Sequence, residues 1–237
     1  ISGEDIFVDV KALIGGLSDE KSDVRRNSVE GLKELGEVNL IRAEDIPAES
    51  LRILIAGLSD EYVDVRRKSV EGLKALGEGN LIRAEDIPAV VKGLIGGLSD
   101  QYYDDVRRNS AEGLKALGEG NLIRAEDIPA VVKGLIGGLS DPDYYVRVRS
   151  AEGLTALGEG KLISGADIPA ESLERLIGGL SDKNSYVRRS SAKVLTTLGK
   201  GNLIVREDMM LDGIQERFAQ FDELELPRES QVLLAKA

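Results

Sequence analysis

The fold is decided by residues 139–158, which have the sequence LSDPDYYVRVRSAEGLTALG. The opening tripeptide Leu-Ser-Asp occurs five times along the chain, at steps of 40 or 41 residues. Each copy is followed by a Val-Arg pair and a closing Leu-Gly pair, and residues 71–100 are identical to residues 112–141. Self-similarity at a fixed period of this length is the signature of repeat architectures. The sequence therefore predicts five stacked units, whose tripeptides begin at Leu17, Leu58, Leu98, Leu139 and Leu180.

Each unit is predicted to be a pair of helices. In the second unit the apolar residues Leu51, Leu54, Ile55 and Leu58 are spaced i, i+3, i+4 and i+7, which places them on one helical face. We expect this first helix over residues 47–58 and a second helix near residues 65–76. No segment shows the alternation of a strand. The sequence therefore predicts an all-α fold.

Particular residues are expected to begin and end these helices. Asp45 would supply an N-cap carboxylate, and Pro47 suits the first helical turn. Gly77 follows the second helix, where a left-handed C′ residue is favoured. Leu81 and Ile82 lie in the connection to the next unit, which can hold one short helical turn. We expect both side chains to be buried.

Glycines lie inside the predicted helices, as at Gly96, Gly97 and Gly113. A glycine in a helix interior costs about 1 kcal/mol relative to alanine, so each needs a reason. Counterparts occur in nearly every unit, whereas a hinge is needed in one place only. We therefore predict that these glycines allow close approach between packed helices.

The repeated motif resembles the core of HEAT repeats. In that family, an Asp that ends the first helix and a Val-Arg pair that opens the second are followed by a small residue and a Leu-Gly close. The resemblance covers roughly residues 4–205, with armadillo repeats as the near alternative. It implies a right-handed α-solenoid of about five two-helix repeats with a C-terminal helical cap. The expected boundaries are 1–36, 37–77, 78–118, 119–158 and 159–199 with its connection to 205, and 206–237 for the cap.

The resemblance also implies a ladder of Asp–Arg contacts between the turns of successive repeats. An arginine fork can bind a carboxylate and a helix end together. A role in packing is expected, because a catalytic carboxylate would not be needed five times. The residues of this ladder are Asp19, Asp60, Asp100, Asp141 and Asp182 with Arg25, Arg66, Arg107, Arg147 and Arg188.

The two ends of the chain differ from the middle. Residues 1–6 match residues 163–168, so the chain begins partway through a unit and without Met, which predicts a fragment of a longer protein. At the other end, Phe218 and Phe221 continue a helical spacing that begins at Leu211 and Ile214. Terminal repeats need an atypical cover over their exposed core. We expect residues 206–237 to provide it.

Composition excludes several classes of function. The formal net charge of -11 is the wrong sign for a protein that binds nucleic acid by neutralising phosphates. Cysteine and histidine are both absent, which removes disulfides, thiolate nucleophiles and histidine acid–base chemistry. No apolar run is long enough to span a membrane. We predict no catalytic residue, cofactor or metal site, and a cytoplasmic location.

One candidate surface is the polar face of the second helices. In the first three units an Arg, a Glu and a Lys share this face, and intrahelical pairing makes it nearly neutral. The last two units break the pattern with a valine and fewer charges, which suits the centre of an interface. Drift near a chain end explains the change equally well. The candidate partner-binding residues on this face are Val148, Arg149, Thr155, Ser190, Lys193 and Thr196.

The tyrosines form a second candidate surface. All six lie in the turns between the two helices of a unit, so stacking would align them along one edge. Tyrosine suits interfaces because it combines a rigid apolar ring with a polar tip. The slightly favoured alternative is that each ring packs over the neighbouring turn. The residues are Tyr62, Tyr102, Tyr103, Tyr144, Tyr145 and Tyr186.

These observations predict a scaffold or adaptor that binds another protein or a peptide and has no catalytic activity. The alternative is an accessory domain that positions a catalytic part of a larger enzyme or complex. Because one fold hosts many functions, the repeat pattern supports the fold more strongly than either function.

Overall fold

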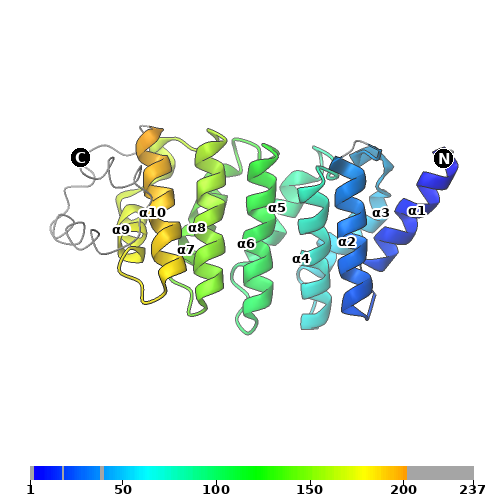
Figure 1. Cartoon of the computed structure of the whole chain (residues 1–237), viewed down its shortest axis with the longest axis horizontal. Coiled ribbons are helices and arrows are strands. Elements are labelled where there is room, and N and C mark those ends of the chain that lie inside the picture. The colour runs from blue at the N-terminus through cyan, green and yellow to red at the C-terminus, as the bar shows by residue number, and fades with distance from the viewer. Residues whose placement is uncertain (1–2, 18, 38–39, 202–237) are drawn as a thin grey trace. The chain divides into compact units, whose positions relative to one another are not determined.

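The computed structural model describes residues 3–17, 19–37 and 40–201, and all regular structure within them is helical (Figure 1). The chain divides into two compact units, residues 1–127 and 128–237. Unit 1 contains α1 (Gly3–Gly16), α2 (Ser22–Glu37), η1 (Ala43–Asp45), α3 (Ala48–Gly57), α4 (Val63–Glu78), α5 (Ile87–Gly97) and α6 (Asp104–Glu119). Unit 2 contains α7 (Ile128–Gly138), α8 (Tyr144–Glu159), η2 (Gly165–Asp167), α9 (Ala170–Gly179) and α10 (Ser185–Lys200).

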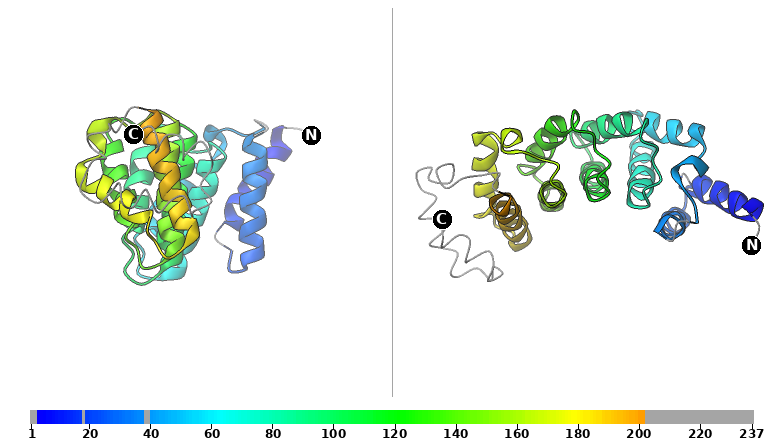
Figure 2. Two further views of the ribbon diagram at one scale, coloured as in Figure 1. Left: turned by 60° about the vertical axis from the view of Figure 1, so that its left-hand side comes forward. Right: turned by 90° about the horizontal axis from the view of Figure 1, so that it is seen from above.

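Consecutive helices pair into the repeats that the sequence predicts. In unit 1, α1 packs on α2, α3 on α4 and α5 on α6, which we name repeats 1, 2 and 3. In unit 2, α7 packs on α8 and α9 on α10, which form repeats 4 and 5. Within each unit the second helices of successive repeats lie side by side, as Figure 2 shows from above. The predicted cap over residues 206–237 lies outside the described residues.

The core lies between the paired helices. Leu54 on α3, Leu73 on α4 and Leu94 on α5 are buried, because the i, i+3, i+4 spacing aims each apolar face at its partner. Leu81 and Ile82 in the connection are also buried, as predicted. The connection that holds them contains turns but no short helix, and short helices occur only in the equivalent connections before α3 and α9 within the described residues, as η1 and η2.

The second glycine of each Gly-Gly pair packs against a serine of the paired helix. A Cβ atom added at Gly97 would lie far inside van der Waals contact with Ser110. Gly113 likewise faces Leu94, whose Cδ1 would lie 3.1 Å from an added Cβ. These glycines confirm the prediction of close approach. Gly96 does not, because it is exposed and an added Cβ would have no neighbour within 4 Å.

Two predicted helix ends are wrong. Gly77 lies inside α4, where the space beside it is taken by Leu117 of repeat 3, and the left-handed residue is Asn80 at φ 54°. Asp45 caps no α-helix: its Oδ2 accepts from the backbone N–H of Arg42, and Pro47 is the N-cap of α3. Both residues do lie close to a helix end, but α4 continues past Gly77 to Glu78 and α3 begins only at Ala48.

Candidate functional site

The turn between the two helices of each repeat is held by the Asp–Arg ladder. In unit 1, Arg66 Nε donates to Asp100 Oδ2 of the next repeat at 2.7 Å. The same guanidinium donates from Nη1 to the backbone carbonyl of Asp60 at 2.8 Å, in its own turn. Arg66 therefore joins two successive turns, as the resemblance to HEAT repeats implies, while the side chain of Arg25 in the first predicted pair lies outside the described part of the structure.

The aspartate of the ladder also shapes the turn that follows it. Asp100 Oδ1 accepts from the backbone N–H groups of Tyr102 and Tyr103, at 3.1 and 3.0 Å. Burial alone would raise the pKa of the Asp100 carboxyl, but the bonds from Arg66 and from these two N–H groups outweigh it and hold that pKa below its usual value. Asp100 is therefore a charged structural group.

Unit 2 repeats this arrangement. Arg147 binds Asp182 of repeat 5, with 2.9 Å between Nε and Oδ2, and donates from Nη1 to the carbonyl of Asp141. Asp182 Oδ1 in turn accepts from the backbone N–H of Asn184 at 2.8 Å. The ladder thus fixes the backbone from which the tyrosines project in both units.

The tyrosine rings are exposed. Tyr62, Tyr102, Tyr103, Tyr145 and Tyr186 have exposed fractions of 67, 78, 44, 44 and 60%. The alternative, that each ring packs over the neighbouring turn, is not supported for Tyr62, Tyr102 and Tyr186, which are each more than half exposed. Tyr103 does lie beside the preceding repeat, with the Arg66 guanidinium 6.0 Å from its ring centroid, and the Tyr144 centroid lies 4.0 Å from that of Tyr145.

The second helices of unit 1 present a surface whose charges are paired. Arg67 binds Asp64 at 2.9 Å, Lys74 binds Glu112 of the next repeat, and Lys115 lies 3.3 Å from Glu119. The predicted intrahelical pairing is present at Arg67, whose Nη1 also lies 3.9 Å from Glu71, and at Lys115, whereas Lys74 pairs between helices.

The second-helix surface predicted in units four and five is partly wrong. Val148 is only 8% exposed and Thr155 only 3%, and the Thr155 hydroxyl donates to the carbonyl of Ala151 at 3.0 Å. The equivalent side chains Arg67 and Lys74 are themselves about two-thirds to three-quarters covered, since long charged side chains lay their stems along apolar surface. A short side chain at the same position is buried.

The remaining residues of that surface are accessible but scattered. Arg149 Nη1 donates to Glu152 at 2.8 Å, and Lys193 lies 3.3 Å from Glu159. Ser190 and Thr196 are half-buried. Because Val148 and Thr155 are buried, the surface keeps only these four polar or charged residues, which do not form the apolar centre of an interface.

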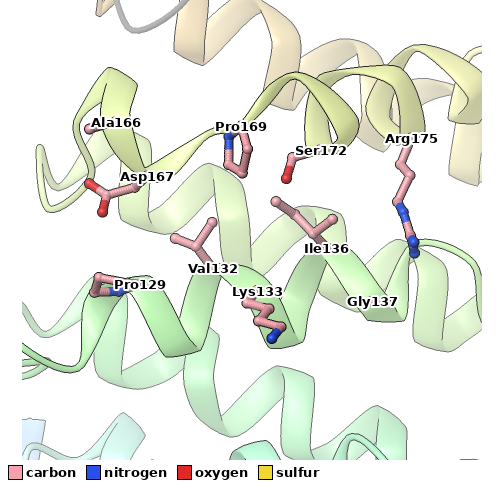
Figure 3. Close-up of a pocket in the computed structure, with 10 residues that line it drawn as sticks. All are labelled: Pro129, Val132, Lys133, Ile136, Gly137, Ala166, Asp167, Pro169, Ser172 and Arg175. Carbon is pink, nitrogen blue, oxygen red and sulfur yellow. The ribbon is translucent and has the colours of Figure 1, made fainter.

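A pocket of about 520 Å³ lies between α7 and α9 in unit 2 (Figure 3). Val132 and Ile136 of α7 form its apolar floor, with Asp167 at one end and Arg175 at the other. The repeat pattern did not predict this pocket. The available signal was Arg175, which stands where repeat 3 has Gly93. The other lining residues are Pro129, Lys133, Gly137, Ala166, Pro169 and Ser172.

Two further properties concern the described part of the chain alone. In residues 3–17, 19–37 and 40–201, no helix is long and apolar enough to cross a membrane. The same residues contain no group of three or more carboxylates placed to hold a metal ion.

No protein-family model and no curated protein matches the sequence. Solved structures do match in fold. An engineered protein is similar at a TM-score of 0.66 and 20% identity, covering 97% of this chain and 94% of its own. A designed armadillo repeat protein in complex with the peptide (KR)4 is similar at a TM-score of 0.62 and 13% identity, and the match covers 94% of this chain and 97% of the designed chain.

An archaeal HEAT-like repeats protein from Thermococcus onnurineus NA1 has a TM-score of 0.60 at 16% identity, covering 96% of this chain and 84% of its own. At such identities the likeness concerns the fold. Together with the five helix pairs it shows that the chain has the α-solenoid fold of HEAT and armadillo repeats.

Proposed function

We propose that the chain is a non-catalytic scaffold that binds another protein or a peptide through its tyrosine-bearing turns. One observation carries the proposal: five large aromatic side chains are exposed where the second helices begin, beside the Asp–Arg ladder. Tyr62, Tyr102 and Tyr103 lie in the turns as predicted, whereas Tyr145 and Tyr186 belong to the first turns of α8 and α10. Tyrosine gives a large contact area at low entropic cost, because only two side-chain torsions must be ordered. A tyrosine on a rigid backbone loses little further conformational entropy on binding.

The charge around these rings indicates the kind of partner surface. Glu61 precedes Tyr62, and Asp104 follows Tyr103, and both acidic residues are exposed. The whole chain has a net charge of -11. Complementary potentials steer association and exclude like-charged partners, so a partner with a basic surface fits these turns best.

The shared fold supports the same function. The designed armadillo repeat protein to which this chain is similar holds a basic peptide, (KR)4. A second designed neighbour is described as made for modular peptide recognition. These properties belong to those proteins, and the exposed tyrosines are the feature of this chain that supports extending them to it.

The proposal is tested with a variant that removes the rings of one unit, Tyr62→Ser with Tyr102→Ser and Tyr103→Ser. Peptides selected from a displayed library on the wild-type chain are titrated into wild type and variant by calorimetry. Tyrosine is enriched among the few interface residues whose truncation costs about 2 kcal/mol or more, so we expect the loss of all three rings to lower the affinity at least tenfold. Circular dichroism checks that the fold is kept.

The matched control changes the second-helix face instead, with Arg149→Ala and Lys193→Glu. We expect this control to bind as wild type does. Unchanged binding by the tyrosine variant, together with loss in the control, would overturn the proposal and place the partner on the second helices.

A further inference from the structure

We infer that the pocket between α7 and α9 binds the C-terminal end of a peptide whose last residue is apolar. This site is separate from the tyrosine turns, and the inference does not rest on the function proposed for them. It follows from the way repeat 5 departs from repeat 3, from the charges that line the pocket, and from the pocket's size.

One pocket-lining residue of α9 differs greatly in size from its counterpart in repeat 3. There the corresponding position is Gly93, and a Cβ atom added at it would collide with Leu58 at the end of α3. Repeat 5 has Arg175 at this position, and its Nη1 lies 3.5 Å from the hydroxyl of Ser140 after α7.

A second substitution makes the wall of the pocket polar. Ser172 stands where repeat 3 has the buried Val90. Its side chain is only 6% exposed, and Figure 3 shows its hydroxyl turned toward α7. A smaller side chain leaves volume between the helices, and its hydroxyl offers a hydrogen bond inside an otherwise apolar site.

The far end of the pocket differs from repeat 3 in its charge. In repeat 3, Arg83 pairs with Asp86, with 2.6 Å between Nη2 and Oδ2, and Arg83 Nε also lies 3.7 Å from Glu85 Oε1. Repeat 5 has Ser164 and Ala166 in place of Arg83 and Glu85. The equivalent carboxylate, Asp167, accepts from the backbone N–H and the hydroxyl of Ser164 at 2.8 and 2.7 Å. This end is therefore acidic without a facing guanidinium.

The lining charges favour an anion at the opposite end. Lys133 and Arg175 line the pocket away from Asp167 and bring positive charge to it. Arginine recognises carboxylates through its planar fork of N–H donors. Between the charged ends, Val132 and Ile136 provide a floor for an apolar side chain.

A peptide terminus satisfies all of these groups together. Its last residue carries a carboxylate beside an apolar side chain, and its backbone N–H groups can donate to Asp167 and Ser172. A fatty acid has the carboxylate and the apolar body, but it would leave Asp167 and Ser172 facing an alkyl chain, which is costly for buried polar groups. A volume of about 520 Å³ suits a few residues.

The test uses acetyl-Ala-Leu-Leu with a free C-terminal carboxylate, titrated into the whole 237-residue chain by NMR. The same peptide with a C-terminal amide and the fatty acid octanoate are the comparison probes. We expect the free acid to shift signals of α7 and α9 and to bind at least tenfold more tightly than either comparison probe. Equal binding by the amide, tighter binding by octanoate, or no binding of the free acid would overturn the inference.

Matched variants locate the site. Lys133→Ala and Ser172→Val should each weaken binding of the free acid at least threefold. Their counterparts in unit 1, Lys92→Ala and Ser50→Val, should leave it unchanged. Weakening by the unit 1 variants alone would place the peptide elsewhere and overturn the inference. The triple tyrosine variant is expected to bind this peptide normally, so failure here and failure of the proposed scaffold function are distinguishable.

Discussion

Arg66 of repeat 2 and Asp100 of repeat 3 form a contact between consecutive repeats, with Arg66 Nε donating to Asp100 Oδ2 at 2.7 Å. Both side chains are largely buried, with exposed fractions of 15% for Arg66 and 6% for Asp100. Each also binds the backbone of its own turn, so the pair connects two turns rather than two side chains alone. Such a pair differs from an exposed ion pair, which contributes about 0–1 kcal/mol to the free energy of unfolding.

Asp100→Ala should lower the free energy of unfolding by about 1.5–3 kcal/mol. The reason is the loss of a charge-assisted hydrogen bond and the burial of a guanidinium without its carboxylate. Asp104→Ala is the matched control, because Asp104 lies in the same turn but is exposed. Denaturant unfolding followed by circular dichroism measures both. Equal stability of Asp100→Ala and wild type would show that the ladder does not hold the turns.

The contribution of Asp100 should depend on pH. Its pKa is lower in the folded chain than in the unfolded chain, so the unfolded state binds more protons in mild acid. The stabilisation is therefore complete above the unfolded pKa of about 4 and is lost as the pH falls through the folded value. The difference in stability between wild type and Asp100→Asn should be constant near neutral pH and shrink below about pH 4. A difference that grows in acid would contradict the assigned direction.

Leu114→Ala should destabilise the chain by about 2–5 kcal/mol, because it leaves a cavity in a packed interior. Leu114 lies on α6 and has no exposed surface. The matched control is Ile53→Ala on α3, since Ile53 is 58% exposed and should change the stability by less than about 0.5 kcal/mol. A loss below about 1 kcal/mol for Leu114→Ala in the same unfolding experiment would mean that the position is not core.

The repeat period and the helical spacing were sufficient to predict the paired helices, because both depend on local sequence. The contact between Arg66 and Asp100 was inferred from the resemblance to HEAT repeats. Exposure was predicted for Val148 because arginines stand at the equivalent positions of other repeats. The Arg67 side chain is itself about two-thirds covered, so a valine at that position is buried.

The pocket between α7 and α9 could not be predicted from periodicity. Its floor, Val132 and Ile136, has the same residues as the corresponding positions of repeat 3. Arg175 and Ser172, which replace Gly93 and Val90 of repeat 3, line the pocket from α9. A comparison of repeats reveals these substitutions, but only the folded structure shows that both line one pocket.

The pKa of the Tyr144 phenol should depend on the neighbouring Tyr145 hydroxyl. The side-chain hydrogen bond with Tyr145, followed by partial burial and by repulsion from neighbouring negative charges, raises the pKa of the Tyr144 phenol to about 12. Tyr145→Phe removes the hydrogen bond, so the pKa of Tyr144 should fall toward the ordinary value of about 10. NMR of protein labelled in its tyrosine rings measures this directly. Tyr62→Phe is the control and should leave the Tyr144 titration unchanged, whereas a high pKa that persists in Tyr145→Phe would exclude the pair as its cause.

The two glycines of a Gly-Gly pair should respond oppositely to the same substitution. Gly96 is exposed and an added Cβ meets no atom within 4 Å, so Gly96→Ala should stabilise the chain by about 0.5–1 kcal/mol through helix propensity alone. Gly97→Ala should destabilise it by about 1–3 kcal/mol, because the new methyl group collides with Ser110. The Ser110 hydroxyl is buried without a hydrogen-bond partner, so Ser110→Ala alone should be nearly neutral.

The double variant Gly97→Ala with Ser110→Ala then tests the collision itself. Without the hydroxyl, the closest remaining atom is the Cβ of residue 110, at 3.3 Å, which is tight but tolerable after a small shift. Part of the stability lost in Gly97→Ala should therefore return, giving a non-additive cycle of at least about 0.5 kcal/mol. Strict additivity, measured by denaturant unfolding of the four proteins, would show that something other than the approach of α5 to α6 requires glycine at position 97.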